Sequence, residues 1–351
     1  MNLREPDVLA TEILGDLEAA PAQFRAIAGE LEAQMSELHP VMRQVLERFG
    51  QALKGAGLTD MHSGGPAITR AFMRSMAPPS EVLPAIERVE DREIQGPAGP
   101  IPIRVYYPVY ARDLPVLVWF HGGGWVAGGL DEAELTCRRL SNDVGCAVVS
   151  VDYRLAPETP FPGALDDCYA GVRWVTDSAV ELGIDPGQIA VGGDSAGGNL
   201  AACVALRARN AGLPLALQLL VYPAIDTDFS RPSHQDYREG YLLTGSFTEW
   251  AWDCYVPDPR ERTNPEASPI HAGDLTGLPP ALILTAEFDP LRDEGEAYGE
   301  ALAAAGVRAD VRRYEGVVHA FYNLVTQPPV EEVQMASADS ARALRRAFGI
   351  D

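Results

Sequence analysis

A serine at position 195 stands in a sequence pattern that suits nucleophilic catalysis. The segment GDSAG, residues 193–197, has the form G-x-S-x-G, and it lies between the β-prone residues 188–191 and an Ala-rich helical segment. At a sharp strand-to-helix turn, the residues two before and two after the serine have no room for side chains, and glycine occupies both positions. The alternatives are a glycine-rich turn with an incidental serine and a phosphate-binding loop, but the Walker lysine and the G-x-G-x-x-G spacing of such loops are absent. The pattern therefore predicts that Ser195 is a nucleophile at the top of a sheet.

A second glycine-rich segment could stabilise the negative charge that such a nucleophile creates. HGGGW, residues 121–125, directly follows the apolar run 114–120. Acyl transfer needs backbone amides directed at the developing oxyanion. The amide of Ala196 is one candidate, and the three glycines can supply the others because they have no side chain to block the substrate. We expect His121 to be structural, because it precedes the serine, and we take Trp125 as a candidate substrate contact.

A serine needs a base to accept its proton, and three histidines follow it: His234, His271 and His319. In folds with this elbow the chain order is serine, acid, histidine. His319 lies in a loop after the β-prone residues 307–314, and such loops carry the site residues of parallel sheets. We therefore choose His319 and expect the other two histidines at the surface.

Two carboxylates are candidates for the acid that orients this histidine. Glu287 and Asp289 both follow the apolar run 281–285, and Pro290 follows Asp289. Asp289 stands at a turn before a helical segment, where an aspartate could also serve as an N-cap. The geometry of a triad favours Asp289, with Glu287 as the alternative.

Composition excludes several classes of partner. The 351 residues carry a formal net charge of −22, which argues against binding to nucleic acid or to anionic membrane surfaces. The five cysteines contain no C-x-x-C pair, so they signal neither a disulfide framework nor a zinc site. The first 20 residues do not read as a secretory signal, and no apolar run is long enough to span a membrane. We expect a cytoplasmic protein, and its oligomeric state, a homodimer included, stays open.

The elements that must position these residues alternate between strand and helix. After a hairpin signal at residues 96–100, apolar β-prone runs alternate with Ala- and Leu-rich segments of helical spacing. This alternation predicts an α/β fold with a mostly parallel central sheet flanked by helices. The expected strands are residues 88–94, 101–107, 116–120, 147–151, 188–191, 216–221, 281–285 and 307–314, and the expected helices are 132–142, 165–180, 196–211 and 292–305.

Two segments fall outside this alternation. Apolar residues recur at helical spacing over residues 31–53, where Pro40 starts a second helix, and a short helical stretch covers 68–76. Residues 229–255 are rich in aromatic side chains and too long for an ordinary loop. Together these segments could form a lid over the site, and ordinary packing of an extra helix pair is the alternative.

Five motifs occur in one order and carry a family resemblance: HGGGW from 121, DYRLAPETPFPGALDD from 152, GDSAGGNLA from 193, AEFDPLRDEG from 286 and VVHAFYNL from 317. Residues 87–345 resemble the hormone-sensitive-lipase-like family of α/β-hydrolases, in particular its microbial GDSAG carboxylesterases. The resemblance implies a catalytic domain over 87–228 and 263–351, and a helical cap from 1–86 and the insertion 229–262.

The resemblance also implies roles for individual residues. Ser195, Asp289 and His319 would form the triad, and Gly123, Gly124 and Ala196 would supply the oxyanion amides. Glu158, Asp166 and Asp167 match family positions that we interpret as structural hydrogen-bonding residues. Ala320 departs from the family, because many relatives have glycine after the histidine.

The expected activity is hydrolysis of short to medium chain acyl esters by a serine carboxylesterase, through an acyl-enzyme and without metal or cofactor. An amidase, an acetyl-transferring enzyme and a long-chain lipase are alternatives within the same chemistry. A small-molecule binding protein is the alternative from another class, since plant gibberellin receptors resemble this family but have lost the triad histidine. The presence of His319 argues against that alternative.

Overall fold

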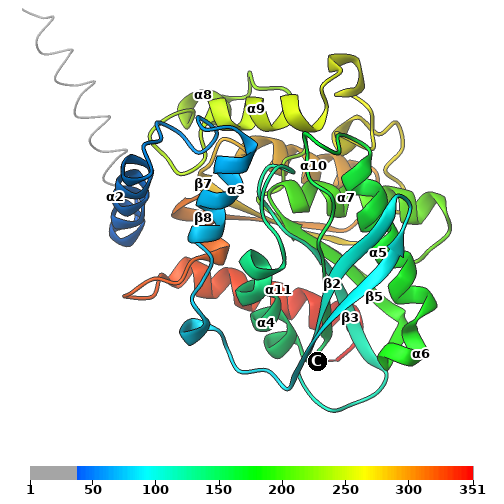
Figure 1. The fold of residues 1–351 in the computed structure, drawn as a ribbon. Helices are drawn as coiled ribbons and strands as arrows, with labels where there is room; N and C mark the ends of the chain where they lie inside the picture. The colour runs from blue at the N-terminus through cyan, green and yellow to red at the C-terminus, as the bar shows by residue number, and fades with distance from the viewer. Residues whose placement is uncertain (1–37, 351) are drawn as a thin grey trace, which may run out of the picture.

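A central eight-stranded sheet organises the molecule (Figure 1). The structure, a computed structural model, describes residues 38–350. Strand order is β1-β2-β4-β3-β5-β6-β7-β8; β2 runs antiparallel to both of its neighbours, and the remaining pairs are parallel. The strands are β1 (Arg88–Gly96), β2 (Gly99–Tyr107), β3 (Leu114–Phe120), β4 (Ala147–Val151), β5 (Ile184–Asp194), β6 (Gln218–Val221), β7 (Ala281–Phe288) and β8 (Ala309–Val318).

The central strands are continuous apolar runs because both faces of the sheet are covered. All seven residues of β3 are buried. Its alternate side chains point to opposite faces: Val118 and Phe120 pack in one core and Trp119 packs in the other. A strand covered on both sides needs apolar residues at every position, which explains why the sequence shows no polar alternation here.

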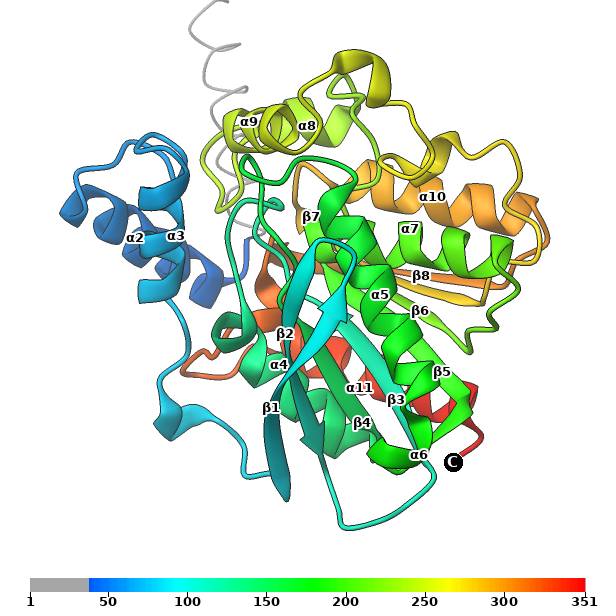
Figure 2. The same cartoon turned by 45° about the vertical axis from the view of Figure 1, so that its right-hand side comes forward.

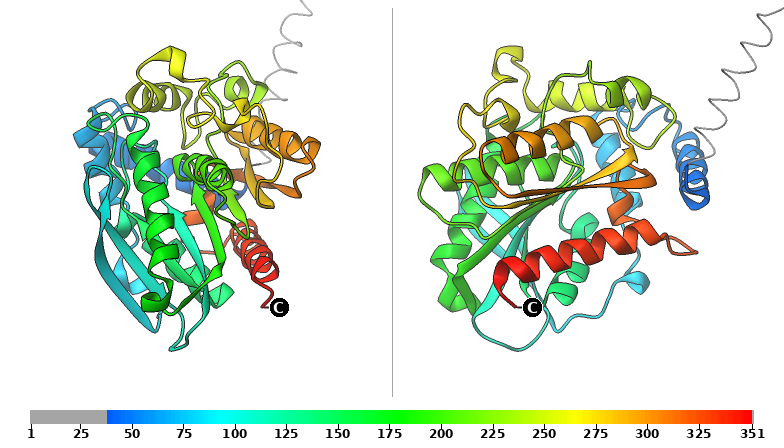
Figure 3. Two further views of the ribbon diagram at one scale, coloured as in Figure 1. Left: turned by 90° about the vertical axis from the view of Figure 1, so that its right-hand side faces the viewer. Right: turned by 180° about the vertical axis from the view of Figure 1, so that it is seen from behind.

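Helices form a layer on each face of the sheet. Figures 2 and 3 show α5, α6, α7 and α10 on one side and α4 with α11 on the other. Helices α4 and α11 bury an apolar stripe and expose charged residues, as expected for surface helices, whereas α7 is buried along most of its length. These helices are α4 (Leu130–Val144), α5 (Gly163–Asp177), α6 (Ala179–Leu182), α7 (Ala196–Asn210), α10 (Arg292–Ala304) and α11 (Glu331–Phe348).

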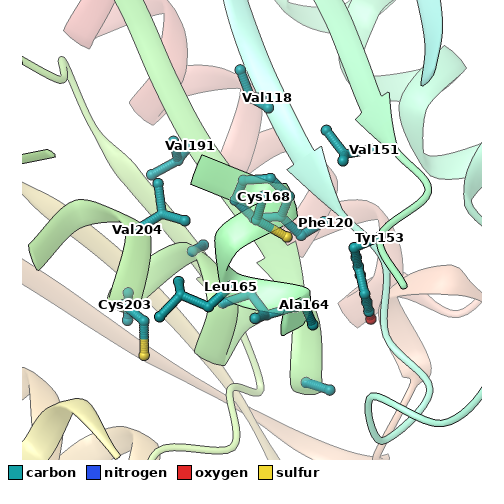
Figure 4. Close-up of a cluster of buried hydrophobic side chains, with 14 of the residues drawn as sticks. Val118, Phe120, Val151, Tyr153, Ala164, Leu165, Cys168, Val191, Cys203 and Val204 are labelled. Atoms are coloured by element: carbon teal, nitrogen blue, oxygen red, sulfur yellow. The ribbon is translucent and has the colours of Figure 1, made fainter. Parts of the chain in front are cut away.

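The core between the sheet and the helices α5 and α7 supports the functional end of the strands. Figure 4 shows Val118, Phe120 and Val191 from the sheet facing Leu165 and Val204 from these helices, and all five are essentially inaccessible to solvent. Large apolar groups in such a layer are costly to displace, because each fully buried aliphatic side chain contributes roughly 1.5–3 kcal/mol. The ends of β3 and β5 are therefore rigidly held.

The order of the strands places a crevice at the carboxyl ends of β3 and β5. From β3 the chain crosses through α4 to β4 on one side, and then returns through α5 to β5 on the other side of β3. The connections therefore diverge at this point, and ligands of open α/β sheets bind where the connections diverge. The segment that follows β3 begins at His121, and Ser195 follows β5 directly.

Four further helices lie around this end of the sheet: α2 (Pro40–Gly55), α3 (Pro66–Ser75), α8 (Pro232–Asp236) and α9 (Gly245–Tyr255). Figure 2 shows α2 and α3 beside the sheet and α8 and α9 above it. The guanidinium of Arg70 in α3 donates to the carbonyl oxygens of Val126 and Ala156, at 2.7 and 2.9 Å, and forms an ion pair with Glu158. Arg70 thus fastens α3 to the segments that follow β3 and β4.

Most of the predicted elements are confirmed, with shifted ends. The strand expected at 188–191 runs from Ile184 to Asp194, and the helix expected at 165–180 is two helices, α5 and α6. Helix α2 begins at Pro40, as predicted, whereas the helix predicted before Pro40 lies almost wholly outside the described residues. The C-terminal helix α11 was not predicted. In the described part of the chain, no helix is both long enough and apolar enough to cross a membrane.

Candidate active site

The turn that carries Ser195 has a conformation that few residues other than glycine adopt. Ser195 has φ 56° and ψ −120°, and α7 begins at the next residue. A Cβ atom at Gly193 would collide with the backbone of Gly197, and one at Gly197 would collide with the carbonyl oxygen of Phe120. Both glycines are therefore needed for the turn to pack against the end of β3. This strained geometry holds the serine side chain above the sheet.

The side chain of His319 bridges Ser195 and Asp289. Its Nε2 atom lies 3.0 Å from the Oγ atom of Ser195, and its Nδ1 atom lies 2.7 Å from Oδ2 of Asp289. The histidine is 5% exposed and the aspartate is fully buried. The ring of Tyr222 packs against the imidazole with centroids 4.6 Å apart. The structure therefore brings together the three residues that the sequence singled out, with the spacing of a nucleophile, base and orienting acid.

The aspartate is held by the backbone that follows it. Its Oδ1 atom accepts a hydrogen bond from the amide of Leu291 at 2.9 Å, so that Oδ2 is left to face His319. Glu287, the alternative acid, points elsewhere: its Oε2 atom accepts from the amide of Gly316 at 2.7 Å. In this structure Asp289 is the carboxylate that contacts the imidazole.

The other histidines have different surroundings. The expectation that His234 lies at the surface is wrong, because it is 1% exposed and its Nε2 atom lies 2.8 Å from Glu294. Burial of this pair is explained by the fold: α10 packs against α8, and the carboxylate also accepts from the amide of Ile225. His271 is exposed, as expected, and contacts Asp226 at 3.0 Å.

His121 is structural by its contacts, although it adjoins the glycine segment. Its Nδ1 atom lies 2.8 Å from the carbonyl oxygen of Gly122, and its ring stacks on Tyr153 with centroids 4.2 Å apart. Burial lowers the pKa of His121, because the charged imidazolium would lose its hydration. The hydroxyl of Tyr153 donates to the His121 carbonyl oxygen at 2.7 Å and so fixes the start of this segment.

Three backbone amides near Ser195 suit the stabilisation of an oxyanion. Gly123 and Gly124 have φ values of 121° and 62°, in the region that favours glycine. Among the described residues, none accepts a hydrogen bond from the amides of Gly123, Gly124 or Ala196. Ala196 is the first residue of α7, where the aligned peptide dipoles favour negative charge. These donors are unengaged and are therefore available to a developing oxyanion.

The amide of Gly122 has a different partner, which was not predicted from the sequence. It donates to Oδ1 of Asp194 at 3.0 Å, while Oδ2 accepts from Nδ2 of Asn323 at 2.9 Å. The Asn323 Oδ1 atom in turn accepts from the hydroxyl of Thr136 at 2.8 Å. Burial raises the pKa of the Asp194 carboxyl, although the hydrogen bond from Asn323 opposes the effect. The aspartate that directly precedes the serine in the G-x-S-x-G motif is the one sequence signal that points to this role.

Two apolar cavities meet at Ser195. The larger has a volume of about 200 Å³, and its walls include Met73 of α3, Leu242 and His319. The smaller has a volume of about 20 Å³, and Trp125 lines it. Trp125 is 2% exposed and stacks on Tyr255 with centroids 4.5 Å apart, so its indole is a fixed wall of the smaller cavity.

The carboxylates that we interpreted as structural each pair with an arginine. Asp167 is fully buried and accepts from the guanidinium of Arg154 at 2.7 and 2.8 Å. Asp166 pairs with Arg207 at 2.5 Å, and Glu158 pairs with Arg70 as described above. None of these carboxylates is among the residues that line the two cavities.

Comparison with known proteins agrees with this fold. A family model described as alpha/beta hydrolase fold matches residues 117–323. Carboxylesterase NlhH of Mycobacterium tuberculosis is 41% identical over 319 residues, which cover 89% of this chain and 97% of that protein. Arylesterase of Saccharolobus solfataricus is 44% identical over 222 residues, 63% of this chain and 72% of that protein. The solved structure of a hyperthermophilic esterase from Pyrobaculum calidifontis is 42% identical, with a TM-score of 0.81, and the match covers 90% of this chain and 99% of that one. With a serine elbow at the carboxyl ends of β3 and β5 and relatives that match nearly its whole length, this chain belongs to the alpha/beta hydrolase fold family.

Proposed function

We propose that this protein is a serine carboxylesterase that hydrolyses small acyl esters through an acyl-enzyme intermediate. The observation that carries the proposal is the position of His319, whose two ring nitrogens contact Ser195 and Asp289 at 3.0 and 2.7 Å. The similar proteins named above, a carboxylesterase, an arylesterase and a hyperthermophilic esterase, support the same reaction class.

In the first half of the reaction, Nε2 of His319 accepts the hydroxyl proton of Ser195 as Oγ bonds to the ester carbonyl carbon. Asp289 stabilises the imidazolium that forms and holds its orientation. The carbonyl oxygen becomes an oxyanion that the amides of Gly123, Gly124 and Ala196 stabilise. The bond from carbon to the alcohol oxygen then breaks, and His319 returns the proton to that oxygen as the alcohol leaves.

In the second half, a water molecule replaces the alcohol. His319 removes one proton from the water while the water oxygen bonds to the acyl carbon. The same amides stabilise the second oxyanion. The bond to Ser195 Oγ then breaks, and the serine recovers its proton from the imidazolium. The products are the free acid and the original enzyme, so apart from this water the steps need only residues that the site contains.

We further propose that residues 1–86, of which the structure describes 38–86, and the insertion 229–262 act as a cap over the site. Support comes from the larger cavity, whose walls include Met61 and Met73 from the N-terminal segment and Leu242 and Phe247 from the insertion. Methionine adapts its shape readily, which suits a wall that must accept different alcohols. The apolar walls favour neutral ester substrates over charged ones.

Hydrolysis of p-nitrophenyl acetate, measured with and without a serine-directed fluorophosphonate, tests the proposal. We expect turnover that the probe abolishes, with the label on Ser195. In Ser195→Ala both turnover and labelling should be lost while the circular dichroism spectrum is unchanged, because loss of a triad nucleophile costs about six orders of magnitude in kcat. Turnover near the wild-type value in Ser195→Ala would exclude this mechanism. A wild-type protein that neither hydrolyses the ester nor reacts with the probe would instead support the binding-protein alternative.

A further inference from the structure

Four residues line both cavities at the site: Gly124, Ser195, Leu243 and Phe247. They form the boundary between a space of about 200 Å³ and one of about 20 Å³. One water molecule needs roughly 10–15 Å³ in such a space. The smaller cavity therefore has room for a group of about methyl size. Apart from Ser195, all of its lining residues are buried, so its walls have little freedom to retreat.

The chemistry determines which half of an ester enters each cavity. His319 must deliver a proton to the oxygen of the leaving alcohol, and it lines only the larger cavity. The amides that would stabilise the oxyanion lie between the two cavities, since Ala196 lines only the smaller one, Gly123 lines only the larger one and Gly124 lines both. With the carbonyl carbon at Ser195, the alcohol therefore extends into the larger cavity and the acyl group extends into the smaller.

The ring of Phe247 is the main side-chain part of this boundary. It is 4% exposed and lies directly against the glycine segment, because a Cβ atom added at Gly124 would be 3.1 Å from a ring carbon. On its other side the ring contacts Trp250 and His62, with centroids 5.6 and 6.3 Å apart. The ring is thus packed on two sides and cannot swing away from Ser195 without disturbing its neighbours.

A chain of hydrogen bonds from the N-terminal segment fixes the backbone that carries this ring. Thr244 is the N-cap of α9, and its hydroxyl oxygen accepts from the amide of Phe247 at 3.1 Å. The same hydroxyl donates to Oδ2 of Asp60 at 2.5 Å. Ser246 also donates to that oxygen, at 3.2 Å. Asp60 is therefore a positioning residue for Phe247, across 184 positions of sequence from Thr244.

We propose that Phe247, held in place by Asp60 through Thr244, restricts the acyl half of the substrate to acetyl and leaves the alcohol half free to be larger and apolar. The inference rests on the proposed esterase function and adds a substrate class to it: acetyl esters of bulky alcohols. Each methylene added to the acyl chain would have to displace buried side chains, and one methylene in a close-fitting pocket changes kcat/KM by roughly 10- to 200-fold.

The test compares kcat/KM for p-nitrophenyl acetate, butyrate and hexanoate, which share one leaving group. For the wild type we expect kcat/KM for acetate to exceed that for butyrate, which has two more methylenes, by at least about a hundredfold, and that for hexanoate by more. In Phe247→Ala the two cavities merge. We expect the ratio of kcat/KM for acetate to kcat/KM for hexanoate to fall to within about threefold of unity, because the lost wall no longer excludes the longer chains. Leu243→Ala removes the other shared apolar side chain and should change the ratio in the same direction, which keeps the test available if Phe247→Ala does not fold.

Two further comparisons separate positioning from general damage. Thr244→Val removes the hydroxyl that joins Asp60 to Phe247 and should reduce the acetate preference, whereas Thr244→Ser keeps the hydroxyl and should retain it. Met76→Ala alters only the larger cavity, where Met76 is 46% exposed, so it should change KM for acetates of different alcohols and leave the acyl ratio unchanged.

A wild-type enzyme that hydrolyses hexanoate as efficiently as acetate would overturn the inference. A folded Phe247→Ala that keeps the wild-type ratio would overturn it as well. Both results are distinct from failure of the proposed function, in which no ester is hydrolysed and the fluorophosphonate does not label Ser195.

Discussion

Asp194 and Gly122 join the two segments that would stabilise the oxyanion, through a hydrogen bond of 3.0 Å from the glycine amide to the carboxylate. Gly122 precedes Gly123 and Gly124, and Asp194 precedes Ser195 and Ala196. One buried carboxylate therefore sets the distance between the amides that follow β3 and the nucleophile that follows β5. A small error in that distance is costly, because misplacement by 1 Å can reduce a rate about a hundredfold.

Asp194→Asn should lower kcat by roughly 10- to 100-fold and the free energy of unfolding by about 1–3 kcal/mol. The new amide can accept from Gly122, but its NH2 group then faces the NH2 group of Asn323, and one buried donor loses its partner. Steady-state kinetics and urea unfolding measure the two effects. Adding Asn323→Asp places a carboxylate oxygen at position 323 opposite the new amide donor at position 194, so the double variant should recover most of the lost activity. A double variant no more active than Asp194→Asn would contradict the role of this hydrogen bond in positioning the two segments.

Asp289→Asn should reduce kcat by about 10⁴-fold, because an amide favours the wrong tautomer of His319 and cannot stabilise the imidazolium. Glu287→Gln is the matched control. Its Oε2 atom contacts the amide of Gly316 rather than the imidazole, so we expect a loss of less than about tenfold from a small shift of that loop. Kinetics with p-nitrophenyl acetate distinguish the two, and a larger loss in Glu287→Gln would mean that the alternative acid is the functional one.

Gly124→Ala should reduce kcat by about 100-fold, because its Cβ atom would lie 3.0 Å from the Cβ of Ala251 and would displace an oxyanion amide. Gly57→Ala serves as the control. Gly57 has a similar left-handed φ, 72°, but has open space around it. Both substitutions should cost about 1 kcal/mol in the free energy of unfolding. If Gly57→Ala lowered kcat equally, backbone strain rather than the local amide would be responsible.

The ion pair between Arg70 and Glu158 should stabilise the protein only above acidic pH. The hydrogen bond from Arg70 lowers the pKa of Glu158 from 4.5 to about 2. Because the folded-state pKa lies below the unfolded value, the stabilisation is complete above pH 4.5 and is lost as the pH falls toward 2.

Glu158→Gln should therefore lower the free energy of unfolding at pH 7 by less than about 1 kcal/mol, since Glu158 is 62% exposed, and by less still at pH 3. Urea unfolding at both pH values measures the difference. Glu181→Gln, which removes an exposed ion pair with Arg92 away from α3, controls for the general loss of one negative charge. If the free energies of unfolding of the wild type and Glu158→Gln differed by the same amount at both pH values, the ion pair with Arg70 would not be the source of the stabilisation.

The parts of the fold that were predictable from sequence are those with strong local signals. Strand β3 is apolar at each of its seven positions because both faces are covered, so its pattern indicates a buried strand directly. The elbow at Ser195 was also predictable, since the steric demands of the turn fall on Gly193 and Gly197 in the same short motif.

Pairings between distant residues were not predictable in this way. The burial of His234 depends on Glu294, 60 positions further along the chain, and on the packing of α8 against α10. Asn323 meets Asp194 across 129 positions, and nothing adjacent to either residue indicates the contact. Hydrogen bonds of this kind depend on tertiary structure, so they leave no periodic pattern that a single sequence could reveal.

Met73 and Met76 lie well before residue 117, where the match to the family model begins, yet they form part of the wall of the larger cavity. The reaction machinery and this wall are thus encoded in separate stretches of the gene. Exchanging residues 1–86 between relatives should transfer preference for the alcohol while the turnover chemistry of the recipient persists. Substitutions in this amino-terminal stretch can therefore alter which alcohols the larger cavity accepts without altering Ser195, Asp289 or His319.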